Sequence, residues 1–458
     1  MSDLSFLYFF LPVFMGLYLI IPKGLKGKLV LVAGAGLIFC ADPVGLIPMG
    51  VCILSGYLFG IFIHNFRDKA ISKLILALEI AVNAAAFLLF HRSAFDGSDF
   101  MTLIGQRSLV KSAAVIGVSV MPLHSIAYCV DIFKKKYVCE HRFTTVAEYI
   151  AFFPSFAAGP ILSFDKIRNK LEEPKPDFDK CANGVRLLMS GIIMKLFISN
   201  SMIELWHDVT DIPVNDLPML SAWLGSLAFT LFFYFEVCAF NYIAYGTASM
   251  MGIELSNGFR GAANSYSFRA LGRRMNPSLY FWSRNYIYRN IRHEGNCFSE
   301  FAAIMISVIA TMLWYGTSLR NIIFASAVII ILCLEKILET PLKKLPEFLR
   351  SILVLFLMIV IMPFMAFSDF KEAQDFIGVM FGAGNSAIDT VSGYLLGAYS
   401  FVLITGIIIM FGLLGYLMRK KVFNNEYLRT IIQPVWVIAL LIICTAFLVS
   451  GENCNYLF

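Results

Sequence analysis

Apolar runs of about 17–25 residues follow one another along most of the chain, and short polar segments separate them. Each run is long enough to cross a hydrocarbon core of ~30 Å as a helix. The runs are continuous rather than alternating, which is typical of membrane-spanning helices and not of barrel strands. The pattern predicts an all-α polytopic membrane protein with about 11–13 tilted, partly re-entrant helices in a single domain over residues 1–458. The expected spans are Leu4–Ile21, Leu29–Cys40, Ile47–Ile63, Leu74–Phe90, Val110–Phe133, Gly184–Met202, Leu217–Met251, Phe301–Trp314, Ile322–Leu338, Ile352–Phe367, Gly393–Met418 and Ile431–Val449.

Two segments depart from this regular pattern. Glu148–Ile161 is short and is broken by two prolines and a glycine, which indicates a re-entrant element or a half-helix that lines a cavity. A kinked helix between ordinary spans is the alternative. Leu217–Met251 is too long for one perpendicular crossing, so it tilts, kinks or passes twice.

Charge agrees with this interpretation and sets an orientation. Hydrophobic residues make up 59% of the chain and charged residues only 15%, and the net charge is +6. The basic residues gather in short loops after every second crossing, as the positive-inside rule expects, so they do not indicate nucleic-acid binding. With the loops at 23–28, 67–73, 134–136 and 419–421 on the inner side, we expect a cell-membrane protein with both termini outside.

Other sequence signals add little chemistry. The ten cysteines are scattered and mostly lie in apolar runs, without the spacing of metal ligands, so they favour buried thiols and no metal site. Leu4–Ile21 has no basic segment before it and no cleavage site after it, so we interpret it as the first span rather than a signal peptide.

Ionisable residues inside the apolar runs are the first candidates for function, because a charge in a membrane is costly. Lys195 lies within one expected span, where it either faces a cavity or extends to the interface. Glu236 lies among apolar neighbours in another expected span. It is either a functional group or a group that forms a hydrogen bond between helices.

A polar stretch, Asn257–Trp282, follows the second of these spans and contains Arg273 and Arg274. In such an apolar chain, this density of Arg, Asn and Ser indicates a site. Arginines that anchor the protein at the membrane surface are the alternative. Because irregular, polar backbone is tolerated only where protein or water covers it, Leu271–Trp282 and Phe152–Ile161 are predicted to line a central cavity surrounded by a ring of helices.

Several of these segments resemble, in order, the membrane-bound O-acyltransferase family. The resemblance is to its bacterial branch of alginate O-acetylation and D-alanyl-lipoteichoic acid transfer proteins. It starts with IGVSVMPLHSIAYCVD, which ends at Asp131, and continues with FFPSFAAGPI at Phe152–Ile161. GIIMKLFISN at Gly191–Asn200 and YFEVCAFNYIAYG at Tyr234–Gly246 follow, the latter with Glu236 where the family has Asp. Further similar segments extend nearly to the end of the chain.

The resemblance implies transfer of an acyl group to a hydroxyl, but both family histidines are replaced. The one that follows Arg-Arg-Trp corresponds to Asn276, and the catalytic one in Leu-Trp-His-Gly corresponds to Tyr315. A histidine removes a proton readily near pH 7 because its ordinary pKa is about 6.5. A phenol, with an ordinary pKa of about 10, is a poor base unless a cation lowers that value, and an amide cannot serve as one.

The candidate residues follow from these matches. The catalytic candidates are Tyr315, Asn276 and Glu236, and the candidates for binding substrate or donor are Arg273, Arg274, Trp282 and Trp314. We predict that Tyr315 lies in the cavity with its hydroxyl bonded to Asn276 or Glu236, because an unpaired buried phenol costs about 1–3 kcal/mol.

Two hypotheses stay open on the sequence. In the first, the chain is an O-acyltransferase with an altered site that moves an acyl group, acetyl in the branch it resembles, toward an envelope polymer. In the second, it is a catalytically degenerate scaffold that binds a partner or ligand. A transporter that shares only apolar composition is disfavoured by the ordered motifs. The resemblance implies no bound cofactor, an acyl-CoA or acyl carrier as co-substrate, and membrane lipid, an envelope polymer or an extracytoplasmic acyltransferase as partners.

Overall fold

The computed structural model describes residues 5–90, 117, 119–255, 261–316, 318–384, 386–412, 439, 441–442 and 445–446. Within these ranges the regular structure is helical, without strands. The first half contains α1 (Leu11–Ile20), α2 (Lys23–Ala41), α3 (Leu46–Asn65), α4 (Ile71–Phe90), α6 (Met121–Phe133), α7 (Phe143–Ile150), α8 (Phe164–Glu172), α9 (Phe178–Ile193), α10 (Asn200–Thr210) and α11 (Met219–Met250). The second half contains α12 (Phe268–Met275), α13 (Pro277–Ser283), α14 (Arg289–Ile291), α15 (Cys297–Tyr315), α16 (Leu319–Ile337), α17 (Glu339–Lys343), α18 (Glu347–Ile361), α19 (Pro363–Ala366), α20 (Phe370–Gly378) and α21 (Thr390–Met410).

The apolar runs form the long helices that the sequence predicts. In the described ranges, eight helical stretches are long and apolar enough to cross a membrane, and Ser5–Ile20 and Met121–Phe133 are shorter apolar helices. The chain is therefore an all-α, multi-pass membrane protein. The expected span Ile431–Val449 lies almost wholly outside the described residues, as do the beginning of Val110–Phe133 and the end of Gly393–Met418.

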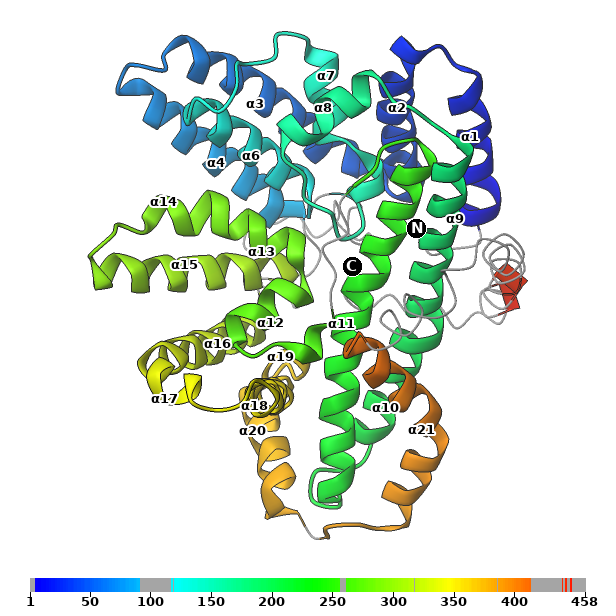
Figure 1. Ribbon diagram of the computed structural model, residues 1–458, viewed down its shortest axis with the longest axis vertical. Coiled ribbons are helices and arrows are strands. Elements are labelled where there is room, and N and C mark those ends of the chain that lie inside the picture. The colour runs from blue at the N-terminus through cyan, green and yellow to red at the C-terminus, as the bar shows by residue number, and fades with distance from the viewer. Residues whose placement is uncertain are drawn as a thin grey trace, which may run out of the picture.

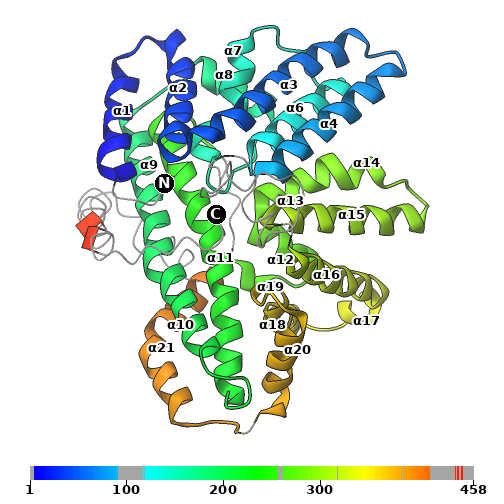
Figure 2. The same ribbon diagram turned by 180° about the vertical axis from the view of Figure 1, so that it is seen from behind.

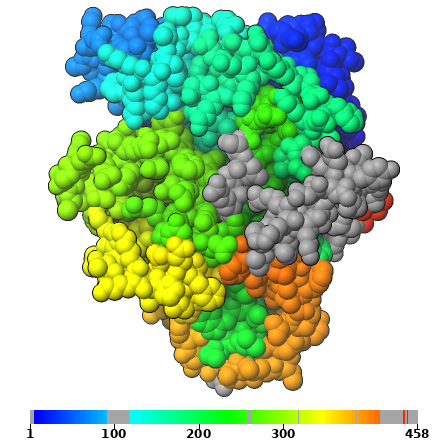
Figure 3. All heavy atoms as spheres, viewed as in Figure 1, coloured from blue at the N-terminus to red at the C-terminus, as the bar shows by residue number. Residues whose placement is uncertain are grey.

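Helix α11 lies at the centre of the fold (Figures 1 and 2). It is one continuous helix of 32 residues, and 89% of the residues in its apolar window are buried, against 22–44% in the other candidate spans. The group α3, α4 and α6 lies beyond one end, α13 to α18 lie along one side, and α10 and α21 lie near the other end. In Figure 3 the orange side chains of α21 lie beside the green lower part of α11. A helix of this length, at 1.5 Å per residue, is about 48 Å long, so it exceeds a hydrocarbon core even when tilted.

Glycines allow α9 to pack against α11 over most of its length. A Cβ atom on Gly246 of α11 would lie 2.5 Å from the backbone nitrogen of Leu188, and one on Gly191 of α9 would lie 2.7 Å from the carbonyl oxygen of Ala239. Small residues at such positions are the usual means of close helix contact in membranes. The small residues therefore hold α9 directly against the central helix, α11.

The segment Phe152–Ile161 has the irregular backbone that its prolines and glycine predict, but it does not line the cavity described below, where it was predicted to lie. Residues Phe152, Phe153 and Phe156 are buried, and the Phe153 ring packs edge-on against Phe14 of α1. None of the residues 152–161 lines the cavity described below. The segment is a packing element between α1, α2 and α11, because its aromatic side chains bury best against other helices.

Candidate functional site

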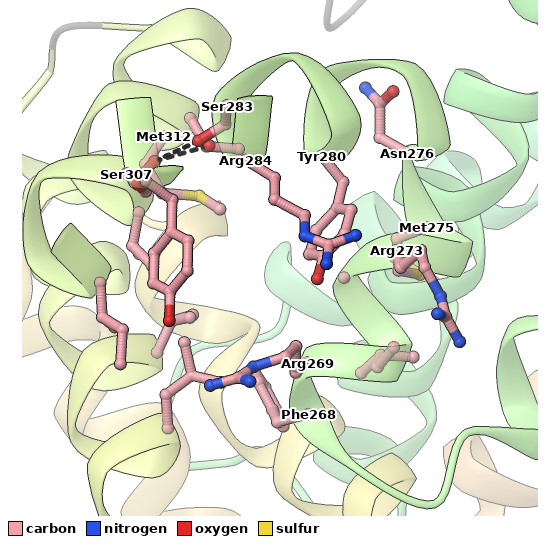
Figure 4. A pocket seen from close by; sticks show the side chains of 18 of the residues that line it. Phe268, Arg269, Arg273, Met275, Asn276, Tyr280, Ser283, Arg284, Ser307 and Met312 are labelled. Atoms are coloured by element: carbon pink, nitrogen blue, oxygen red, sulfur yellow. Dashed lines mark hydrogen bonds between the residues drawn. The ribbon is translucent and has the colours of Figure 1, made fainter. Parts of the chain in front are cut away.

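A cavity of about 390 Å³ lies beside the central helix. Its walls come mainly from α12, α13 and the π-helical turn Arg284–Tyr288 on one side, and from α15, α16 and α18 on the other (Figure 4). The lining residues are Phe233, Phe268, Arg269, Leu271, Gly272, Arg273, Met275, Asn276, Tyr280, Ser283, Arg284, Tyr288, Arg292, Ile304, Ser307, Val308, Thr311, Met312, Tyr315, Phe324, Val328, Leu332 and Met358. The predicted cavity segment Leu271–Trp282 thus supplies several of its residues.

Asn276 forms the corner between α12 and α13. Helix α12 ends at Met275 and Pro277 starts α13, where a proline is tolerated because its missing N–H needs no partner. The Asn276 side-chain oxygen accepts a hydrogen bond from the backbone N–H of Leu279 at 3.2 Å, which caps α13. Since a backbone N–H can only donate, this cap fixes which end of the amide carries the oxygen.

Tyr315 lies beside Asn276 at the end of α15. It is the last residue of α15, and Gly316, with a φ of 150°, turns the chain immediately after it. The Asn276 amide nitrogen donates to the Tyr315 hydroxyl oxygen at 3.0 Å, and both residues are buried. The hydrogen bond expected for Tyr315 is therefore present. Because the phenol oxygen accepts this bond, its own hydrogen can be donated toward the cavity.

Four arginines give the cavity its charge. Arg269, Arg273, Arg284 and Arg292 line it, and no carboxylate of the described residues lies within ion-pair distance of their side chains. Figure 4 shows the guanidinium groups of Arg269 and Arg284, from α12 and from the turn Arg284–Tyr288, extending into the cavity. Arginine side chains can bind an anion such as a phosphate through paired N–H bonds.

The opposite part of the wall is apolar. Val308 and Met312 of α15 and Phe324, Val328 and Leu332 of α16 lie there. The cavity thus joins a cationic part to an apolar part, with the Asn276–Tyr315 pair on its wall. Among the described residues, the lining contains no His, Asp, Glu, Cys or Lys, and hence neither a conventional general base nor a set of metal ligands.

Three of the four residues predicted to bind substrate or donor lie outside the cavity lining. Arg274 donates to the carbonyl oxygen of Gly261 at 3.0 Å. The Trp282 indole donates to the carbonyl oxygen of Leu123 at 3.0 Å, and the Trp314 indole donates to that of Ser119 at 2.7 Å. These side chains fasten the cavity helices to neighbouring segments, and only Arg273 of the four lines the cavity.

Glu236 also lies away from the cavity, in an ion pair with Lys195. The Lys195 ammonium is 2.7 and 2.8 Å from the two Glu236 carboxylate oxygens, and the Ser199 hydroxyl donates to the same carboxylate at 2.5 Å. Both charged side chains are fully buried. The two ionisable residues of separate spans thus neutralise each other between α11 and the π-helical turn Met194–Ser199.

Sequence reasoning missed Arg269, Arg284 and Arg292 as lining residues. Their spacing offered a partial signal, because Arg269 and Arg273 are four residues apart and share one face of a helix. Arg284 and Arg292 lie in a basic segment that is equally typical of a membrane surface, so their side chains could not be placed from sequence.

Comparisons with known proteins agree with the resemblance. A family model described as "MBOAT, membrane-bound O-acyltransferase family" matches residues 135–372. The chain is 27% identical over 335 residues to the probable alginate O-acetylase AlgI of Pseudomonas aeruginosa. The aligned region covers 71% of this chain and 64% of that protein. It is 21% identical over 356 residues to the peptidoglycan O-acetyltransferase of Helicobacter pylori, covering 70% of this chain and 67% of that protein. It is 22% identical over 319 residues to the teichoic acid D-alanyltransferase of Bacillus subtilis, covering 62% of this chain and 73% of that protein.

Proposed function

The chain belongs to the membrane-bound O-acyltransferase family, and on that premise we propose that it transfers an acetyl group to a hydroxyl of a cell-envelope polysaccharide. The names of its relatives support an envelope acceptor, since they act on alginate, peptidoglycan and teichoic acid. The observation that carries the proposal is that four arginines and the Asn276–Tyr315 pair line the same cavity.

The arginines in this proposal hold the phosphate groups of an acyl-CoA or of a phosphopantetheine carrier. A guanidinium remains charged at any physiological pH and binds phosphate through paired N–H bonds. The apolar wall then accommodates the rest of the donor arm. Arg269 and Arg284 are the best placed, because they extend into the middle of the cavity.

The Tyr315 hydroxyl serves the acyl group in this proposal. The acceptor oxygen bonds to the acyl carbon, the carbon–sulfur bond breaks, and the acceptor's proton leaves with the thiolate. Negative charge develops on the acyl oxygen in between, and a hydrogen bond from Tyr315 stabilises it. Asn276 positions the phenol, because its capped amide leaves only the N–H end for Tyr315. Glu236 supports the fold through Lys195 rather than acting on the substrate.

The test is acetyl transfer from radiolabelled acetyl-CoA to purified envelope polysaccharide by the full chain in lipid nanodiscs. We expect Tyr315→Phe to lower kcat by about 10²–10³, as loss of one oxyanion donor does. Arg269→Gln and Arg284→Gln should mainly raise the KM for the donor. Tyr394→Phe removes the same atom from an exposed tyrosine of α21 and should leave the rate unchanged.

The alternative is a scaffold that binds an anionic amphiphile in the same cavity without acyl transfer. It is favoured by one observation, that none of the described residues that line the cavity is a conventional general base. Under this hypothesis the wild type is inactive, and Tyr315→His, which restores the family residue, creates transfer activity. Activity in the wild type that falls with Tyr315→Phe would exclude it.

A further inference from the structure

A second polar site is buried where α3, α4 and α6 pack together, apart from the acyltransferase cavity. Glu79 and Asn83 come from α4, Ser55 from α3 and Ser125 from α6, and all four are buried. None of them lines the cavity of the proposed function. Gly56 on α3 permits the contact, because a Cβ there would lie 2.7 Å from the Ser125 hydroxyl oxygen.

The hydrogen bonds of this site converge on one carboxylate oxygen. The Ser125 hydroxyl and the Asn83 amide nitrogen donate to Glu79 Oε1 at 2.5 and 2.7 Å. The Asn83 nitrogen also lies 3.1 Å from the Ser55 hydroxyl oxygen. Both serine hydroxyls lie 3.2 Å from the carbonyl oxygen of Cys52. The donors of the cluster are therefore all engaged, while oxygen acceptors remain in excess.

Two of those acceptors have no hydrogen-bond partner among the described residues. They are Glu79 Oε2 and Asn83 Oδ1, both buried. No basic side chain of the described ranges forms an ion pair with Glu79, whereas Glu236, equally buried, has Lys195. The titratable groups that face Glu79 are the thiols of Cys52 on α3 and Cys129 on α6, and a thiol cannot supply positive charge.

We propose that Glu79, Asn83, Ser55, Ser125 and the carbonyl oxygen of Cys52 form a binding site for a dehydrated monovalent cation, with Na⁺ as the ion to test. Hard cations prefer oxygen ligands of this kind. One carboxylate balances a single positive charge, whereas a divalent ion would leave an excess charge in an apolar helix group. In this proposal the cation is the missing partner of the two unpartnered oxygens, and it links α3, α4 and α6.

Thermal unfolding of the full chain in lipid nanodiscs tests this proposal. The Tm is measured as NaCl replaces choline chloride at constant ionic strength and pH. Because an ion that binds only the folded state stabilises it by mass action, we expect the Tm to rise with Na⁺ above the dissociation constant. Glu79→Gln, an uncharged replacement of equal size, should abolish the rise. Ser326→Ala, which removes an exposed hydroxyl bonded within α16, should retain it in full.

Direct binding of ²²Na⁺ to the purified chain provides a second measurement that does not depend on stability. We expect one site per chain in the wild type, and its loss in Glu79→Gln and Asn83→Leu. An equal Tm in Na⁺ and choline would overturn the proposal and indicate that Glu79 is simply protonated. A Tm rise or ²²Na⁺ binding that survives in Glu79→Gln would also overturn it, because the ion would then bind elsewhere.

Discussion

The buried pair of Lys195 and Glu236 provides the sharpest test of how this chain is held together. With 2.7 Å between the Lys195 ammonium and the Glu236 carboxylate, their attraction at an effective dielectric of about 20 is about 6 kcal/mol. The cost of removing both charges from water offsets much of this gain. Removing one partner leaves the other charged and buried, which costs about 3–5 kcal/mol. We therefore expect Glu236→Gln and Lys195→Met each to lower the free energy of unfolding by that amount.

The double variant distinguishes the contribution of the ion pair from the cost of leaving one buried charge without its partner. Lys195→Met combined with Glu236→Gln removes both charges, so we expect its stability to be within about 1–2 kcal/mol of the wild type and above that of either single variant. Reversible unfolding in mixed micelles gives the free energy of unfolding of the wild type, both single variants and the double variant. Glu254→Gln is the matched control, because Glu254 is exposed and its ion pair with Lys180 is long, at 3.7 Å. We expect this substitution to change stability by less than about 1 kcal/mol.

The opposite pattern would refute this reasoning. If Glu236→Gln were as stable as the wild type but had lost acetyl transfer, Glu236 would be a group of the reaction rather than of the fold. Additive losses in the double variant would show that the two side chains do not stabilise each other.

Three further predictions concern packing, pH and orientation. Gly246→Ala should lower the unfolding free energy by about 1–3 kcal/mol, because its Cβ would meet the α9 backbone, while Gly393→Ala, with open space around it, should not. Burial alone would raise the pKa of Glu140, but hydrogen bonds from one arginine and the charge of Arg168 bring it below its usual range. That stabilisation is present above the unfolded pKa of about 4.3 and is lost as pH falls through the folded pKa, so Glu140→Gln should flatten the fall in Tm during acidification. A variant that keeps only Cys40, which is exposed, should react with an impermeant maleimide from outside the cell, and labelling only after permeabilisation would reverse the orientation.

The spans could be predicted closely because lipid selects an apolar run of defined length. Ile47–Ile63 was expected and α3 extends over Leu46–Asn65, a difference of one or two residues at each end. Leu217–Met251 could not be resolved in the same way, because length alone does not separate one long helix from two passes. The structure shows one continuous helix, α11, and its burial depends on the helices that surround it.

The candidate site was predictable where the chain breaks its own apolar pattern. Asn276 and Tyr315 were singled out as replacements in ordered motifs, and the fold brings them to 3.0 Å across 39 residues. Arg284 and Arg292 were not, because an arginine near a helix end has the same sequence signal whether it faces a cavity or the membrane surface. The pairing of Lys195 with Glu236 depends on which helices touch, and periodicity within one helix carries no such information.

The proposed correspondence of Asn276 and Tyr315 to the two family histidines also bears on how the cavity responds to pH. A phenol, an amide and a guanidinium keep their charge between pH ~5 and ~9, whereas an imidazole changes its charge within that range. Among the lining residues that the structure describes, the charged side chains are all arginines, so the lining itself keeps its charge over that range. Tyr315→His would add a titration near the ordinary histidine pKa of about 6.5, and that added step would identify the residue as part of the binding site.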